Sequence, residues 1–122
     1  MSKLQQTYKV KAYVNASHAM RWANGVGQKH NHTWELIFEI KSLEDKMIVF
    51  KDIDTVIKSV TSIISGKYLN DLQEFSEVNP SLENLTEFLF SQLNQELKKI
   101  GGQLIRLEVG ESPTHSYVIS NY

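Results

Sequence analysis

Cysteine is absent from this chain of 122 residues. That absence excludes disulfide bonds, cysteine-ligated zinc and any thiol nucleophile. Neither sign of charge dominates, because 13 lysines and arginines stand against 14 aspartates and glutamates, which gives a net charge of −1. With no basic stripe along the chain, nucleic acid and anionic membrane surfaces are not expected partners.

Long apolar runs are also missing. No stretch is long enough to span a bilayer, and residues 1–6 contain no apolar core of a signal peptide. We therefore expect a cytoplasmic protein with no membrane partner. Hydrophobic residues make up 41% of the chain and charged residues 22%, which is typical of a globular protein and, at this length, of one domain over residues 1–122.

Two runs in the first third of the chain alternate with the period of a β-strand. Residues 7–18 form the first run, residues 30–41 form the second, and the Asn24–Gly27 segment between them predicts a flexible loop. The face shared by the apolar side chains carries Val10, Ala12, Val14, Ala16 and His18 in the first run, and His30, His32, Trp34, Leu36, Phe38 and Ile40 in the second. Three of the four histidines therefore lie on the apolar face of a predicted strand, at the end of the first strand or at the start of the second.

The rest of the chain predicts two helices followed by two more strands. Apolar residues recur at helical spacing over 52–65 and 82–100, and Asn79-Pro80-Ser81 supplies the cap of the second helix. Alternation returns over 103–111, and a last strand is expected at 116–119. The order ββααββ predicts an α+β fold with an antiparallel sheet.

The three histidines suggest a metal site. If the first two strands pair as an antiparallel hairpin, the end of one lies beside the start of the other, so His18, His30 and His32 converge. Three neutral imidazoles with an open fourth position are a recurring ligand set for catalytic Zn²⁺. The competing interpretation is that all three are polar strand ends facing solvent.

Several short motifs occur in an order that resembles one enzyme family. They are His18, His30-Asn31-His32, Leu69-Asn70, Asn79-Pro80-Ser81-Leu82-Glu83-Asn84 and Glu111-Ser112-Pro113. In this order and spacing they resemble the 6-pyruvoyl-tetrahydropterin synthases and the related 6-carboxy-tetrahydropterin synthases, over about residues 8–117. The resemblance implies the tunnelling fold (T-fold), in which subunits assemble into β-barrel homo-oligomers, commonly trimers or hexamers. It also implies Zn²⁺ held by His18, His30 and His32, and a pterin ring anchored by Glu111.

The residues that move protons in that family are missing here. The family's cysteine base falls at Val26, and its Asp-His pair falls at Ser65 and Gly66. Positioned acid–base groups typically contribute roughly 10²–10⁴-fold to a rate. The resemblance therefore implies a pterin-binding pocket and a zinc site without the family's usual catalytic set.

Other side chains have both an ordinary and a functional interpretation. Glu111 is either an edge-strand charge or a buried anchor on the apolar face. His115 is either a loop residue bonded to its neighbours or a replacement base, and Glu83 either favours a helix N-terminus or acts as a ligand. Trp22 is either a lid over a ring or a surface anchor, whereas Trp34 is expected in the core.

Three hypotheses follow. The first is a zinc-binding relative of the pterin synthases that binds a pterin-like ligand or a protein partner and has lost the family reaction. The second is an active zinc-dependent synthase or lyase in which His115 and zinc-bound hydroxide replace the missing groups. The third is a purely structural barrel without metal.

Overall fold

The first two predicted strands form the long hairpin that positions the histidines. The computed structural model describes residues 4–121. Strand β1 (Tyr8–His18) pairs antiparallel with strand β4 (His30–Ser42), with Ala16 opposite His32 and His18 opposite His30. The alternation in the sequence sets this register, because a slip of one residue would turn the apolar face toward solvent.

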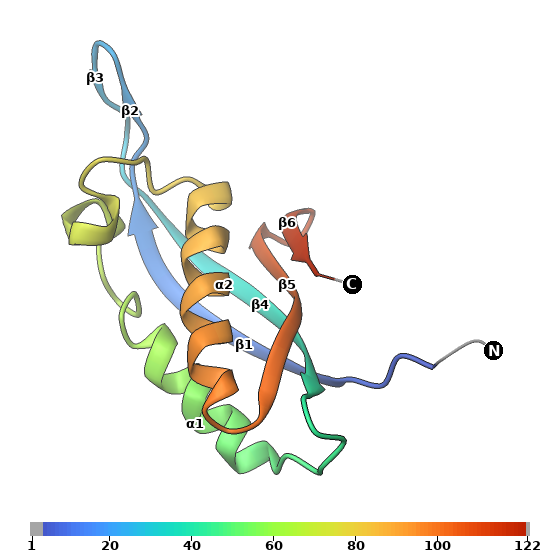
Figure 1. The fold of residues 1–122 in the computed structure, drawn as a ribbon. Helices are drawn as coiled ribbons and strands as arrows, with labels where there is room; N and C mark the ends of the chain where they lie inside the picture. Colours follow the sequence, from blue (N-terminus) through green and yellow to red (C-terminus); the bar gives the residue numbers. More distant parts are fainter. Residues whose placement is uncertain (1–3, 122) are drawn as a thin grey trace.

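The main sheet has four antiparallel strands in the order β1-β4-β5-β6. Strand β5 (Gly102–Ser112) pairs with β4, and strand β6 (His115–Ser120) pairs with β5 through a two-residue turn. The sheet is curved, and both helices lie on one of its faces (Figure 1). The predicted α+β class and antiparallel sheet are confirmed.

The loop predicted between the first two strands is itself a small hairpin. Strand β2 (Arg21–Trp22) pairs with strand β3 (Gly25–Val26), and Gly25 allows the turn with φ of 136°. This hairpin extends past the end of the main sheet (Figure 1). The sequence predicted a flexible loop here, and the structure adds a short hairpin within it, which two residue pairs are too short to reveal by alternation.

Two helices cover the apolar face. Helix α1 (Phe50–Thr61) begins two residues before the predicted start and ends four before the predicted end, and helix α2 (Leu82–Lys98) is capped by the hydroxyl of Ser81. Two short 3₁₀ turns, η1 (Leu69–Asp71) and η2 (Gln73–Phe75), connect them. Neither helix in residues 4–121 is long and apolar enough to cross a membrane.

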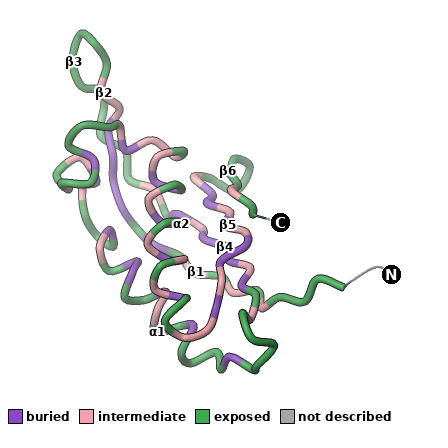
Figure 2. The backbone as a smooth tube through the Cα atoms, viewed as in Figure 1, coloured by how far each residue is buried: buried purple, intermediate pink, exposed green. Residues whose placement is uncertain are grey.

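The core lies between the sheet and the two helices. Buried residues follow the inner face of the sheet and of each helix, whereas the β2–β3 hairpin and β6 are mostly exposed (Figure 2). On β4 the predicted face grades from exposed His30 through half-buried His32 to Trp34, which is fully buried. Burial of this face of β4 thus falls toward the histidines, whereas His18 at the end of β1 is buried.

Candidate metal centre

Two of the predicted histidines lie in contact above the core. The rings of His18 and His32 have centroids 5.0 Å apart. Both rings also contact the indole of Trp34, at centroid distances of 5.2 and 5.0 Å. Trp34 donates its Nε1 hydrogen to the carbonyl of Ala16, at 3.1 Å, which fixes this support across the β1–β4 pair. Both imidazole rings therefore pack against the buried indole of Trp34.

The third predicted histidine lies at the rim of this cluster. The centroid of the exposed His30 ring is 6.5 Å from that of His18 and 6.1 Å from that of His32. His30 is the first residue of β4, and its side chain lies outside the core. The hairpin register thus brings all three rings to one end of the sheet, as the sequence predicts, with His30 the most peripheral.

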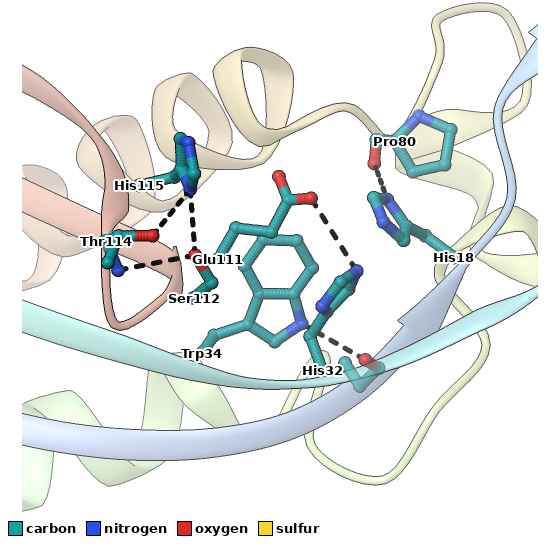
Figure 3. A network of polar contacts seen from close by, with 9 residues as sticks. His18, His32, Trp34, Pro80, Glu111, Ser112, Thr114 and His115 are labelled. Atoms are coloured by element: carbon teal, nitrogen blue, oxygen red, sulfur yellow. Dashed lines mark hydrogen bonds and ion pairs between the residues drawn. The ribbon is translucent and has the colours of Figure 1, made fainter.

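Glu111 comes from β5 to join the histidines. Its Oε1 atom lies 3.7 Å from Nε2 of His32, and Figure 3 shows the carboxylate directed toward that ring. His18, His32 and Glu111 each offer one ligand atom, and these three atoms all lie within 4.8 Å of one another. The predicted anchor therefore lies beside the predicted metal ligands.

The backbone of the residues before α2 fixes the orientation of His18. Its Nδ1 atom lies 2.7 Å from the carbonyl oxygen of Pro80, in a buried contact. A carbonyl oxygen only accepts hydrogen bonds, so Nδ1 is the donor and carries the hydrogen. The other ring nitrogen, Nε2, then keeps its lone pair, which is the tautomer that a metal-binding histidine requires.

Two asparagines fasten the chain that leaves β1. The side chain of Asn70 accepts from the backbone N–H of Ala19 at 2.9 Å and donates to its carbonyl at 2.7 Å. Asn79 forms the same pair of bonds with Arg21, at 2.7 and 3.0 Å. Each amide side chain forms the pair of backbone hydrogen bonds that a neighbouring strand would form. The residues after His18 are therefore held against the segment that leads to Pro80.

The guanidinium of Arg21 strengthens this attachment. It donates to three backbone carbonyls, those of Phe75, Val78 and Asn70, at 2.6 to 3.1 Å. Hydrogen bonds from a charged donor are stronger than those between neutral groups. The sequence analysis did not predict this network, because side-chain bonds to a distant backbone leave no local pattern.

The surroundings of His32 favour its neutral form. Burial is the largest cause that lowers the pKa of His32 from its usual 6.5, and the neighbouring His18 lowers it further, while Glu111 raises it and His30 lowers it. Only the neutral imidazole has a lone pair for a metal. At neutral pH His32 is therefore ready to bind a cation without first losing a proton.

The donor set fits a zinc ion. Imidazole nitrogen and carboxylate oxygen are both zinc ligands, and sets of three histidines or of two histidines and one glutamate occur in zinc enzymes. The hydrogen bond from His18 to Pro80 supplies the outer partner that metal-binding histidines usually have. The type of the donor atoms and the hydrogen-bond partner of His18 therefore both suit a zinc ion.

A cavity of about 630 Å³ opens beside the candidate centre. Its lining includes His18, His30, Glu83, Glu111 and His115. Pockets for small organic ligands usually measure about 300–1,000 Å³. The cavity is therefore of a size for a bicyclic heterocycle, and Trp22, which is 62% exposed on the β2–β3 hairpin, is not among its lining residues.

His115 lies on the wall of this cavity, at the start of β6. Its Nδ1 atom is 3.1 Å from the hydroxyl oxygen of Ser112 and 2.9 Å from that of Thr114 (Figure 3). These contacts close the turn between β5 and β6. His115 thus has the local partners expected of a turn residue, and it also faces the cavity in which a replacement base would act.

The three positions at which the family resemblance expects acid–base residues are exposed. Val26 is on β3 with 63% of its surface exposed. Ser65 and Gly66 are exposed in the turn after α1, and Gly66 has φ of 73°. The left-handed conformation at Gly66 is one that residues other than glycine adopt at a cost, so the backbone there suits glycine rather than the family's histidine.

This arrangement of sheet and helices is the T-fold of the pterin synthases. The structure of 6-pyruvoyl tetrahydropterin synthase from Caenorhabditis elegans matches with a TM-score of 0.77 at 13% identity, covering 100% of both chains. The enzyme from Plasmodium falciparum matches with a TM-score of 0.67 at 15% identity, over 97% of this chain and 99% of that one. An uncharacterized protein from Wolinella succinogenes matches with a TM-score of 0.66 at 10% identity, over 97% and 100%.

The sequence also assigns the chain to a protein family. The sequence model of 6-pyruvoyl tetrahydropterin synthase matches residues 7–121, and the chain belongs to that family. No curated protein sequence matches the chain. The family resemblance drawn from the short motifs is therefore confirmed.

Proposed function

We propose that this protein is a zinc-binding member of the pterin synthase family that binds a pterin-like ligand and does not carry out the family reaction. The observation that carries the proposal is the grouping of His18, His32 and Glu111, whose ligand atoms lie within 4.8 Å of one another at the edge of a 630 Å³ cavity. His30 stands at the rim of the same cluster.

In this proposal His18, His30 and His32 hold Zn²⁺. Bound there, the ion supplies a Lewis acid that polarises a ligand oxygen at its open position. Glu111 anchors the heterocycle, because one carboxylate can accept two parallel hydrogen bonds from an amino-pyrimidine edge. In this proposal the cavity beside the histidines holds the ring.

The absence of the reaction follows from the residues at three positions. Val26, Ser65 and Gly66 stand where the family resemblance expects a cysteine, an aspartate and a histidine. None of the three side chains present can take or give a proton near neutral pH. Binding without the usual turnover is the simplest consequence.

A homo-oligomer completes the proposal. In the described residues the edges of the main sheet are β1 and β6, and six residues of β6 present mostly exposed side chains. Edge strands offer unpaired backbone groups that pair readily with another chain. Closing the sheet edges between copies would form the barrel that the family resemblance implies, as a trimer or a hexamer.

A second candidate function is an active zinc-dependent synthase or lyase with different acid–base residues. The observation that favours it is His115, which lines the cavity and has its Nδ1 bonded to Ser112 and Thr114. An imidazole on the cavity wall, held by hydroxyl groups of the turn, is placed where it could transfer a proton to a bound ligand. Loss of turnover in His115→Gln, with zinc content unchanged, would favour this function over binding alone.

The test combines binding and turnover on one preparation. Protein purified without chelators is expected to contain zinc, to bind neopterin in a calorimetric titration, and to leave dihydroneopterin triphosphate unconverted. Steady conversion that is lost in His30→Ala would overturn the proposal. The variant His18→Ala, which removes a central ligand, serves as the zinc-free control.

A further inference from the structure

We propose that the metal centre exchanges its ion through the helix-free face of the sheet, by a second opening that is separate from the cavity for the organic ligand. The inference rests on the proposed function, in which His18, His30 and His32 hold the cation and Glu111 anchors the heterocycle. It adds a route for the cation, which that function does not specify. The cation and the organic ligand then reach one centre from opposite sides of the sheet.

The second opening is a pocket of about 440 Å³. Tyr13, Thr33 and Glu35 line it together with His32 and Glu111 of the candidate centre. Alternate residues of a strand point to opposite faces, so Thr33 and Glu35 point away from the buried residues of β4 and from the helices. Tyr13 is opposite Glu35 in the β1–β4 register and lies on the same face. The pocket thus opens on the side of the sheet that the helices leave uncovered (Figure 1).

The candidate ligands are divided between the two openings. His18 and His30 line the cavity of about 630 Å³ on the side of α2, whereas His32 lines the pocket. Of the residues that the structure describes, only Glu111 and Ser112 line both. The proposed metal ligands therefore form a wall that the cavity and the pocket share.

Strand β4 extends beyond its partner β5 at the histidine end of the sheet. The β4–β5 register begins at Glu35, which is opposite Gly110. Residues 30–34 of β4 therefore pair with β1 on one side and have no partner on the other side among the described strands. Glu111 directly follows the last residue of β5 that pairs with β4. The paired part of the sheet thus stops before the histidines, and the cavity and the pocket adjoin at Glu111.

The charge of the pocket favours a cation. Its lining, within residues 4–121, has two carboxylates, Glu35 and Glu111, and neither lysine nor arginine. The side chain of Glu35 is 38% accessible, and its Oε2 atom accepts a hydrogen bond from the hydroxyl of Tyr13 at 3.0 Å. Nζ of Lys11 lies 3.8 Å from the same oxygen, but Lys11 is more exposed and lies outside the lining. A cleft lined by one sign of charge concentrates ions of the opposite sign, so this pocket attracts hydrated divalent cations.

Separate routes make exchange of the metal independent of the organic ligand. A heterocycle that fills the cavity blocks the approach from the side of α2 and leaves the pocket open to solvent. Zinc is then not trapped by the bound ligand, and it does not have to enter before the ligand does. Glu111 stays available to the heterocycle, because the three histidines supply the metal ligands.

The first experiment measures how fast the zinc-loaded full chain releases zinc to a chromophoric chelator, at chelator concentrations where the rate no longer depends on the chelator. Asn31→Trp places an indole on the wall of the pocket, and Gln103→Trp places one at the other end of the same face, outside the pocket. A barrier on the route slows release and uptake by the same factor. We therefore expect Asn31→Trp to release zinc several-fold more slowly than the wild type and Gln103→Trp, with an unchanged zinc affinity.

The second experiment tests the charge of the route without changing its size. Glu35→Gln removes a carboxylate from the pocket, and Glu108→Gln makes the same change on the same face outside the pocket. After removal of zinc, we expect Glu35→Gln to take up zinc about 10-fold more slowly than the wild type at low ionic strength, the lower end of electrostatic steering. The difference should shrink at high salt, and Glu108→Gln should take up zinc at the wild-type rate.

A release rate of Asn31→Trp equal to that of the wild type would overturn the inference, with or without neopterin in the cavity. Equal uptake rates of Glu35→Gln and Glu108→Gln at low ionic strength would also overturn it, which keeps the test decisive if Asn31→Trp folds poorly. Continued release from wild type saturated with neopterin, with the same slowing in Asn31→Trp, supports the route. A wild-type protein that binds no zinc would instead reject the proposed function.

Discussion

Nδ1 of His18, at the end of β1, lies 2.7 Å from the carbonyl oxygen of Pro80, just before α2. The two residues are 62 positions apart in the chain. This bond joins the sheet to the helix layer at the candidate metal centre. It also leaves the lone pair on Nε2 of His18, so the position of Pro80 sets the orientation and the tautomer of this ring.

Asn79→Ala should weaken both the fold and the metal centre. The substitution removes two hydrogen bonds to the backbone of Arg21 and leaves those backbone groups without their partner. We expect a loss of about 1–3 kcal/mol in the free energy of unfolding, measured by denaturant titration. Because Pro80 follows directly, zinc affinity should also fall, by about 10-fold.

The matched control is Asn94→Ala. Asn94 accepts a hydrogen bond from the backbone of Leu104, at 3.1 Å, away from the histidines. This variant should lose stability but keep its zinc affinity. Equal zinc affinities for Asn79→Ala and the wild type would show that Asn79 acts only on stability.

The stability of the metal-free protein should fall as the pH falls from 7 toward acid values. Burial and His18 lower the pKa of His32 below 6.5 in the folded chain, so the unfolded state binds a proton at a higher pH than the folded state. Linkage then requires that stability be full above 6.5 and be lost as the pH falls through the folded pKa. Denaturant titrations of wild type and His32→Gln over this range measure the effect.

In His32→Gln the acid loss of stability should be smaller than in the wild type, since the titrating ring is gone. Identical pH dependence in the two proteins would contradict the assignment to His32. His115→Gln provides the comparison, because it removes an exposed histidine outside the His18–His32–Glu111 group.

Gly66→Ala should destabilise the protein by about 1 kcal/mol. Gly66 has φ of 73°, and no atom lies within 4 Å of where a Cβ would stand, so the cost comes from the backbone alone. Gly101→Ala, at φ of 84° and equally open, should show a similar loss. An unchanged midpoint of thermal unfolding in Gly66→Ala would contradict a left-handed turn at this position.

The same backbone constraint bears on the proposed loss of the family reaction. Restoring the family's residues with Val26→Cys, Ser65→Asp and Gly66→His places a histidine in a conformation that disfavours it. We expect this triple variant to remain without turnover of dihydroneopterin triphosphate. Measurable conversion would contradict a role for the backbone of the turn in the proposed loss of the reaction.

Chelation of the metal should lower the midpoint of thermal unfolding. A ligand that binds only the folded state at 100 times its dissociation constant adds about 2.7 kcal/mol. A chelator should therefore destabilise the wild type and have no effect on His18→Ala, which cannot hold the ion. Equal unfolding curves with and without chelator, in protein shown to contain zinc, would contradict a site formed by the folded state.

Much of the fold follows from patterns that are local in the sequence. Period-2 alternation predicts β1 and β4 and their shared face, and the Asn-Pro-Ser cap with its apolar stripe predicts α2. The pairing of His18 with His30 follows from the hairpin register. Each of these features depends on residues close together in the chain or on one antiparallel pair.

The features that the sequence does not predict depend on distant contacts. The bond from His18 to Pro80 and the clamp of Asn79 on Arg21 join segments about 60 residues apart (62 and 58). Alternation over 103–111 allows Glu111 to lie on the apolar face, but its approach to His32 is a contact between distant segments of the chain. Local periodicity carries no information about such contacts.

Elemental analysis of protein purified without chelators tests the central claim most directly. The account predicts stoichiometric zinc in the wild type and none in His18→Ala, the buried ligand whose ring is fixed by Pro80. Zinc near zero in the natively purified wild type, or an equal amount in His18→Ala, would contradict it.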